Sequence, residues 1–358
     1  MKVLIQRKTI LLSVMILLGW LVGACFFSQP TPDNEQATPT PTVTPTATLV
    51  PSKTAISPTS TPTRVFPTEP ALLPSFKPSQ LGTVDTNVVY CHTNDGTELR
   101  MDVFYPGTDT GLWPVMMWVH GGGWHSGHKG SQSFFPELTE FGLLGVTIEY
   151  RLSPEYKFPA HIEDVKCALR FLRANAEHFH LDPDRILLIG GSAGAHLVSL
   201  AGTTADSGEF NVGQYRDYDA SVQAVIALSA PTDLVNWGCE NPDMVEAYYR
   251  EVFGSDARCG ETDPILVNAS PITYVSEDDV PFLFVVGTAD EIVPYQQSEM
   301  MNEALLAVGV SSEIILMEGA DHNLQKPDDP NAEDIAWQAM IDFILTQLDL
   351  PAPDWYSD

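Results

Sequence analysis

The chain has 358 residues, of which 44% are hydrophobic, and its formal net charge is −29 at pH 7. A surface this acidic repels phosphate groups, which argues against nucleic acid and anionic membrane surfaces as partners and opposes a strongly anionic substrate. Residues 81–358 are numerous enough to form one large domain around a single core.

The first 24 residues have the pattern of a secretory signal peptide. Basic residues up to Lys8 precede an apolar run over 9–22, and the segment ends in Val-Gly-Ala-Cys25. This ending resembles a bacterial lipobox, which implies that Cys25 is the lipidated first residue of the mature protein. More than one acyl chain is what stable anchoring requires. We expect an extracytoplasmic protein anchored to the membrane only through this lipid, or a secreted protein if Cys25 is incidental.

Residues 25–80 are dominated by Pro, Thr and Ser, with Thr-Pro repeats over 38–46. Such a composition cannot build a core, so we expect an extended, solvated tether. The catalytic domain is then predicted to span 81–358.

The first two strands are predicted at 88–92 and 98–105. The Asn-Asp-Gly96 sequence between them is a hairpin signal, so this edge of the sheet is expected to be antiparallel. Later strands alternate with helices, for example over 160–176, which favours a mostly parallel sheet covered on both faces. We interpret Cys167, on the apolar face of that helix, as a buried free thiol; Cys91 has no obvious partner.

An apolar strand at 114–120 ends in His120-Gly-Gly-Gly-Trp124. Glycines directly after a strand let the backbone turn its N–H groups toward a neighbouring site, as an oxyanion hole requires. We expect the N–H groups of Gly121 or Gly122, together with that of Ala193, to hold an oxyanion. His120 is interpreted as a support for the loop.

The most informative motif is Gly190-Gly-Ser-Ala-Gly194. It follows an apolar strand at 185–190 and opens a helical segment at 193–201. Strand, sharp turn and helix form the setting in which Gly-x-Ser-x-Gly presents a nucleophilic serine. Ser192 is therefore the predicted nucleophile.

A serine nucleophile needs a histidine base and an acid that orients it. Late strands are predicted at 281–287 and 312–317; the first is followed by Asp290 and the second by His322. We assign these residues as acid and base. Asp233, after the strand at 222–228, stays the main alternative for the acid, whereas Asp321 is too close to His322 in sequence to reach the correct ring nitrogen.

The segment 235–280 is the largest insertion between strands, and we expect it to form a small cap or rim over the site. It contains Cys239 and Cys259, which we expect to be bridged outside the cell.

Several motifs occur in the order typical of one family. They are His120-Gly-Gly-Gly-Trp124, Tyr150-Arg-Leu-Ser-Pro-Glu155, Phe158-Pro-Ala160, Asp164 and Gly190-Gly-Ser-Ala-Gly194. The set resembles the α/β-hydrolase carboxylesterases of the hormone-sensitive-lipase kind, near the bacterial feruloyl and acetyl-xylan esterases. The resemblance covers about residues 85–348 and implies an α/β-hydrolase fold with about eight strands. It assigns the same nucleophile, acid, base and oxyanion glycines.

The chain departs from lipase-like members at Gly191, where they often carry Asp, and it has no helical period before residue 85 that could form a lid. Both departures count against long-chain lipids. We expect a serine esterase for short or aromatic acyl esters, free or carried on polysaccharide, with no cofactor and no metal. A serine aminopeptidase and an arylformamidase-like hydrolase on the same fold are the alternatives.

Overall fold

A computed structural model describes residues 71–131, 139–205, 208–237, 239, 241–326, 329 and 332–352. Its centre is an eight-stranded sheet with the order β1-β2-β4-β3-β5-β6-β7-β8. The strands are β1 (Val84–His92), β2 (Glu98–Phe104), β3 (Trp113–Val119), β4 (Leu144–Ile148), β5 (Leu181–Gly191), β6 (Ala224–Leu228), β7 (Phe282–Gly287) and β8 (Ser312–Met317). β2 pairs antiparallel with β1 and β4, and all other pairs are parallel.

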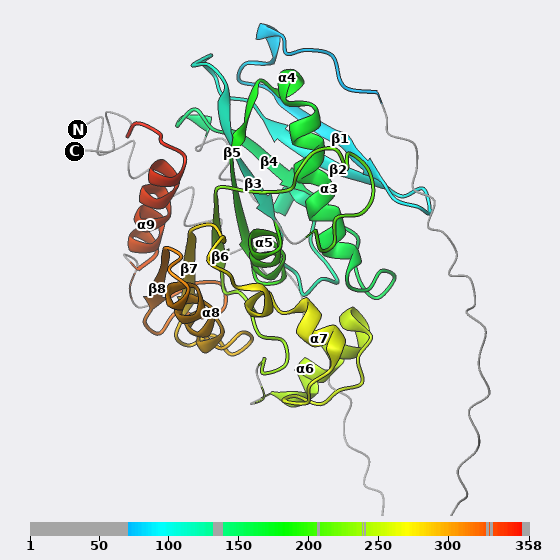
Figure 1. The fold of residues 1–358 in the computed structure, drawn as a ribbon. Helices are drawn as coiled ribbons and strands as arrows, with labels where there is room; N and C mark the ends of the chain where they lie inside the picture. The colour runs from blue at the N-terminus through cyan, green and yellow to red at the C-terminus, as the bar shows by residue number, and fades with distance from the viewer. Residues whose placement is uncertain are drawn as a thin grey trace, which may run out of the picture.

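Helices occupy the connections between the strands and the C-terminal segment. The α-helices are α3 (Ala160–Ala174), α4 (Ala176–Phe179), α5 (Ala193–Thr203), α6 (Pro242–Tyr248), α7 (Pro264–Ala269), α8 (Gln296–Ala307) and α9 (Ala332–Gln347). Short 3₁₀ helices are η1 (Pro78–Gln80), η2 (Lys129–Ser131) and η4 (Pro271–Tyr274), and η3 (Tyr249–Phe253) is a π-helical segment. Figure 1 places α3 and α5 on one side of the sheet and α9 on the other.

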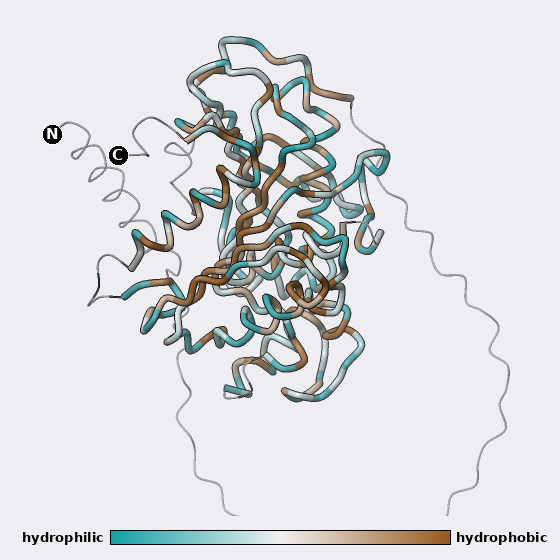
Figure 2. Tube along the Cα trace, turned by 60° about the vertical axis from the view of Figure 1, so that its left-hand side comes forward, coloured by the Kyte–Doolittle hydropathy of each residue, from teal (hydrophilic) through white to brown (hydrophobic). Residues whose placement is uncertain are grey.

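The central strands are buried on both faces because helices cover both. Along β3, Val115 and Met117 join the core on the α3 and α5 side, whereas Met116 and Trp118 join the core beneath α9. This alternation follows the two-residue period of a strand. Figure 2 shows the consequence as a bundle of hydrophobic strands through the middle of the molecule.

The predicted sheet, hairpin and long helix are confirmed. β1 and β2 pair through Cys91 and Leu99 on either side of the predicted turn, and α3 covers most of the predicted 160–176 segment. Strand β4 was not among the predicted strands, although all five of its residues are buried.

The end of the predicted tether lies against the domain. The ring of Phe76 stacks on His180 at 4.8 Å and meets the edge of Trp113 at 5.3 Å. The Leu73 N–H donates to Asn175 Oδ1 at 2.8 Å. The packed part of the chain therefore begins several residues before the predicted boundary at 81, because Leu73 and Phe76 of the Pro-rich segment pack against the core.

The prediction for Cys167 and Cys91 was wrong. They form a disulfide across 76 residues of sequence that ties edge strand β1 to helix α3. Cys167 is buried on the apolar side of its helix as expected, but that side faces β1. The bridge between Cys239 and Cys259 is present.

The signal segment 1–24, Cys25 and most of the tether lie outside the described residues, so lipidation and cell-surface location stay predictions. Among the helices that are described, none combines the length and the apolar character needed to cross a membrane.

Candidate active site

Ser192 stands between the end of β5 and the start of α5. Its backbone has φ 52° and ψ −119°, a conformation that L residues rarely adopt. The turn is held by the Ser192 N–H, which donates to Leu228 O at 2.8 Å, and by the His196 N–H, which donates to Ser192 O at 3.0 Å. The serine side chain is thereby fixed beyond the carboxyl edge of the sheet.

The glycine that follows the elbow is required by close packing. A Cβ on Gly194 would lie 2.0 Å from Val119 O, at the end of neighbouring strand β3. Only a residue without a side chain lets α5 start this close to β3, which explains the last position of the Gly-x-Ser-x-Gly motif.

The predicted base and acid lie next to Ser192 even though they come from separate loops. His322 Nε2 is 3.0 Å from Ser192 Oγ, and His322 Nδ1 is 2.7 Å from Asp290 Oδ2. The Asp290 side chain has 0% exposure. Asp290 accepts a hydrogen bond from the Nδ1–H of His322. The opposite ring nitrogen, Nε2, is therefore unprotonated and can accept the hydrogen bond of the serine hydroxyl.

The carboxylate of Asp290 is fixed by its own loop. Its Oδ1 atom accepts hydrogen bonds from the backbone N–H groups of Ile292 at 2.9 Å and Val293 at 2.8 Å. One oxygen is thus used by the backbone and the other by His322, which sets both the position and the orientation of the imidazole.

The other two aspartates near the late strands have different roles. Asp233 accepts from the N–H groups of Val235 and Asn236 and from the Asn236 amide, so it shapes the start of the insertion. Asp321 Oδ1 accepts from the N–H groups of Asn323 and Gln325 and shapes the loop that carries the base. The structure therefore brings Asp290, and not Asp233, against His322.

The glycine loop after β3 lies directly beside the elbow. A Cβ on Gly121 would be 2.8 Å from Gly191 O and 3.4 Å from Ser192 Cβ. Ala193 is the first residue of α5, so its N–H has no acceptor within the helix. Gly121 and Gly122 line the same cavity as Ser192.

His120 supports this loop from below. Its ring stacks on Tyr150 at 4.2 Å, its Nδ1–H donates to Gly121 O at 2.8 Å, and the Tyr150 hydroxyl donates to His120 O at 3.0 Å. Burial lowers the pKa of His120 to about 4, so the ring is neutral at neutral pH.

Ser192 faces a cavity of about 80 Å³, part of whose wall is aromatic. The rings of Trp124, Trp237 and Tyr248 meet pairwise at centroid distances of 5.4 to 5.8 Å. Trp124 belongs to the glycine loop, whereas Trp237 and Tyr248 belong to the insertion, whose helices α6 and α7 lie beside each other in Figure 1.

Trp124 is held in place by a buried histidine beneath the elbow helix. The Trp124 Nε1–H donates to His196 Nδ1 at 3.3 Å, and His196 Nε2–H donates to Ala269 O of α7 at 2.7 Å. His196 thus connects the glycine loop to the insertion, and burial lowers its pKa to about 4.

A loop over residues 151–158, here called the bracket loop, connects the same parts from the other side. The Ser153 N–H donates to Trp124 O at 2.8 Å, and the Phe158 N–H donates to Val252 O of the insertion at 2.8 Å. The glycine loop and the insertion are therefore both tied to one segment.

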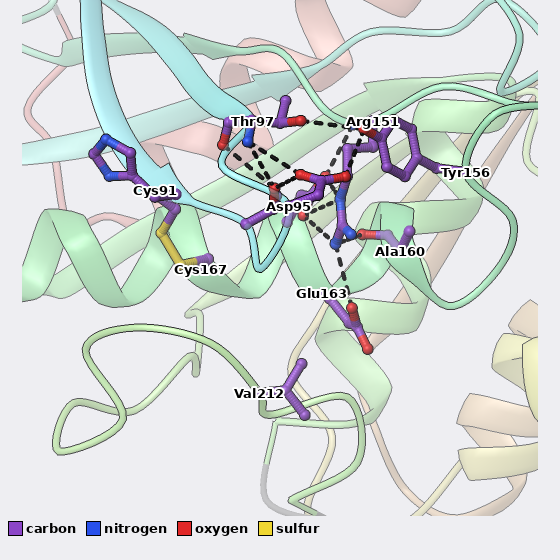
Figure 3. Close-up of polar contacts among 12 residues, drawn as sticks. Cys91, Asp95, Thr97, Arg151, Tyr156, Ala160, Glu163, Cys167 and Val212 are labelled. Atoms are coloured by element: carbon purple, nitrogen blue, oxygen red, sulfur yellow. Dashed lines mark hydrogen bonds and ion pairs between the residues drawn. A yellow bond between two sulfur atoms is a disulfide. The ribbon is translucent and has the colours of Figure 1, made fainter. Parts of the chain in front are cut away.

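Figure 3 shows what anchors the bracket loop. Arg151 forms a 3.2 Å ion pair with Glu163 of α3. It also forms a 2.7 Å ion pair with Asp164 of the same helix. The Tyr156 hydroxyl donates to Asp95 in the β1–β2 turn at 2.8 Å. Both ends of the loop are thus fixed to the body of the domain.

The sequence motifs do not reveal the aromatic wall or the anchoring function of Arg151. Trp124, Arg151 and Asp164 occur in these motifs, but the motifs assign them no role. Trp237 and Tyr248 lie in the insertion, where no motif marked them. Within the part of the chain that the structure describes, no cluster of three His, Cys, Asp or Glu residues could hold a metal ion.

Comparisons with known proteins agree with this architecture. Esterase LipQ of Mycobacterium tuberculosis is 35% identical over 201 residues, which cover 56% of this chain and 47% of LipQ. The chain spans about half the length of the curated relatives that it matches.

Two solved structures share the fold over most of the chain. A truncated carbohydrate esterase from gut microbiota has a TM-score of 0.64 and 25% identity, covering 77% of this chain and 100% of its own. A bifunctional GH43-CE protein of Bacteroides eggerthii has a TM-score of 0.64 and 30% identity, covering 74% of this chain and 35% of its own.

The model of the BD-FAE family matches residues 101–305, which is more than half of the chain and includes β2 through most of α8. The chain belongs to the BD-FAE family, and its fold is that of the α/β-hydrolases.

Proposed function

We propose that this protein is a serine carboxylesterase that hydrolyses esters of short acyl groups, including esters carried on polysaccharides. The observation that carries the proposal is the continuous hydrogen-bonded series from Ser192 through His322 to Asp290, with distances of 3.0 and 2.7 Å. The names of the relatives as esterases support the same reaction.

In the first half of the reaction, Ser192 Oγ attacks the ester carbonyl while His322 Nε2 takes its proton. The buried carboxylate of Asp290 stabilises the imidazolium that forms. The carbonyl oxygen becomes negative and is stabilised by the N–H groups of Ala193 and of Gly121 or Gly122. The ester C–O bond then breaks, and the alcohol leaves with the proton from His322.

In the second half, water attacks the acyl-serine. His322 takes a proton from that water, and Ser192 recovers its hydroxyl proton as the carboxylic acid leaves. Each step uses only groups of this chain, the ester and water.

The size of the Ser192 cavity supports short acyl groups over aromatic ones. A volume of about 80 Å³ is room for about six water molecules at roughly 10–15 Å³ each. An acetyl or propionyl group suits that space better than a feruloyl group. The carbohydrate esterase among the structural relatives supports sugar esters as substrates.

The test is a Ser192→Ala substitution assayed with p-nitrophenyl acetate. We expect kcat to fall by about a million-fold, since the nucleophile is removed, while the circular dichroism spectrum stays unchanged. A fluorophosphonate probe should label the wild type at Ser192 and leave the variant unlabelled. Retained turnover, or cleavage of an aminoacyl-p-nitroanilide but not of the ester, would contradict the proposal.

A further inference from the structure

A second hollow lies next to the Ser192 cavity. We call it the outer groove, and its volume is about 450 Å³. One side is the loop between β7 and α8 and the other is the start of α6. Its lining residues are Asn241, Met244, Thr288, Asp290, Glu291, Ile292, Pro294, Tyr295 and Gln296. Ile292 lines both hollows, so they adjoin at this residue.

The two volumes differ in what they can hold. Small-molecule sites in proteins are typically about 300–1,000 Å³, a range that includes the outer groove at about 450 Å³ and excludes the Ser192 cavity at about 80 Å³. An ester bound at Ser192 would therefore place its smaller part in the inner cavity and extend its larger part over Ile292 into the groove.

The reaction determines which part of the ester lies on that side. The departing oxygen takes its proton from His322 Nε2, so the alcohol must lie on the His322 side of the serine. His322 is bonded to Asp290 at 2.7 Å, and the Asp290 loop is itself a wall of the groove. The alcohol part of the ester is thus the part nearest the groove.

The walls of the groove are held in place before any substrate arrives. Ile292 O accepts from the indole N–H of Trp237 at 3.3 Å. At the start of α8, the side-chain oxygen of Gln297 accepts from the N–H groups of Thr232 and Asp233, each at 2.8 Å. Such preorganisation lowers the entropy lost on binding.

The groove also carries the chemistry of a sugar site. The ring of Tyr295 offers a flat apolar surface for the C–H face of a sugar ring, and Ile292, 36% exposed, adds aliphatic surface beside it. Glu291 and Gln296 are exposed and offer a carboxylate and an amide, respectively, to hydroxyl groups. Among the described residues, none hydrogen-bonds to the side chain of Glu291, Tyr295 or Gln296, so these groups are available to a ligand.

We propose that the outer groove is the leaving-group subsite and that it binds a neutral sugar ring whose hydroxyl carries the acyl group. The carboxylate of Glu291 and the net charge of −29 oppose a uronic acid at this position. The inference rests on the proposed esterase function.

The experiment compares two esters with the same acyl group, p-nitrophenyl acetate and an acetylated xylooligosaccharide, on the full chain. Tyr295→Ala should lower kcat/KM for the sugar ester by about ten-fold, the value of one lost aromatic contact. It should leave p-nitrophenyl acetate within about two-fold, because that alcohol does not need the sugar contacts. Tyr295→Phe keeps the ring and should retain most of the sugar activity.

Tyr218→Ala is the matched control, since this half-buried tyrosine lies before β6 begins, at the opposite edge of the sheet from Ser192. It should change neither ester. An equal loss on both esters in Tyr295→Ala, or no loss on either, would overturn the subsite while leaving the esterase function intact. If the wild type hydrolyses neither ester, the proposed function fails as well.

Discussion

The domain contains two buried networks built on an aspartate, and they behave differently. Asp290 and Asp164 have side-chain exposures of 0% and 3%, and each accepts hydrogen bonds from backbone N–H and from a side-chain N–H. The partner of Asp290 is His322, and the partner of Asp164 is Arg151. The surroundings are similar, and the partner decides what each network does.

An imidazole gains and loses a proton near neutral pH, whereas a guanidinium stays protonated. Burial alone would lower the pKa of Arg151, but the carboxylates of Asp164 and Glu163 outweigh it and hold that pKa above its ordinary value. The guanidinium of Arg151 therefore stays charged and holds the bracket loop, while burial raises the pKa of its partner Asp164 to about 6. In the proposed acyl transfer, His322 gains and then loses a proton, so the charge of its network changes during the reaction.

The largest expected effect comes from a substitution in the His322–Asp290 network. Asp290→Asn keeps an oxygen for the turn of its loop but places an NH₂ group against His322, so the imidazole adopts the wrong tautomer. We expect kcat for p-nitrophenyl acetate to fall by about 10⁴-fold, with little change in the thermal midpoint. A fall of less than ten-fold would mean that this aspartate does not orient the base.

The next largest effect comes from a substitution in the Arg151–Asp164 network, and it is an effect on stability. Arg151→Met leaves Asp164 buried without its cation, which should lower the free energy of unfolding by about 3–5 kcal/mol. Urea denaturation measures the loss. Removing the carboxylate too, in Arg151→Met with Asp164→Leu, should recover much of it.

Arg100 provides the matched control for that substitution. It pairs with Glu98 at the surface, with side-chain exposures of 38% and 44%. Arg100→Met should change the unfolding free energy by less than about 1 kcal/mol. Equal losses in the Arg100 and Arg151 variants would show that burial does not distinguish the two pairs.

The smallest effect concerns a histidine that belongs to neither network. Burial lowers the pKa of His196 to about 4, from an ordinary value of 6.5. Below pH 6.5 the unfolded chain therefore binds a proton that the folded protein does not, so stability is lost as pH falls from 6.5 toward 4. At pH 5 this contribution is about 2 kcal/mol.

His196→Gln removes the titrating group while offering a donor in the direction of Ala269. The free energy of unfolding of this variant should fall less between pH 7 and pH 5 than that of the wild type. The same pH slope in both proteins would assign the acid sensitivity to other groups.

The order of strands and loops in the sequence predicted the positions of Ser192, Asp290 and His322, since each follows a strand whose carboxyl end reaches one edge of the sheet. Strand order alone does not decide between Asp290 and Asp233, because both follow strands that end at that edge. Only the loop conformation determines which carboxylate reaches the imidazole.

The sequence could not predict contacts that depend on which elements cross in space. Cys167 was placed on the correct face of its helix, but nothing in its periodicity shows that this face meets β1 and Cys91. The aromatic wall could not be predicted for the same reason. Tyr248 and Trp237 come from an irregular insertion, and no sequence pattern shows how that insertion crosses the sheet. Hydrophobic periodicity predicts helices and strands, whereas side-chain packing in the folded protein decides which of them are in contact.

The loops at the carboxyl edge of the sheet supply different groups for the proposed reaction. The nucleophile and the Ala193 N–H follow β5, the glycine loop follows β3, the acid follows β7 and the base follows β8, while the outer groove is lined by the β7–α8 loop and the start of α6. Variation within the β7–α8 loop beyond Asp290 therefore offers a route to new alcohol preferences that leaves the bond-breaking groups untouched. In that sense the scaffold is modular, with substrate choice and chemistry open to independent change.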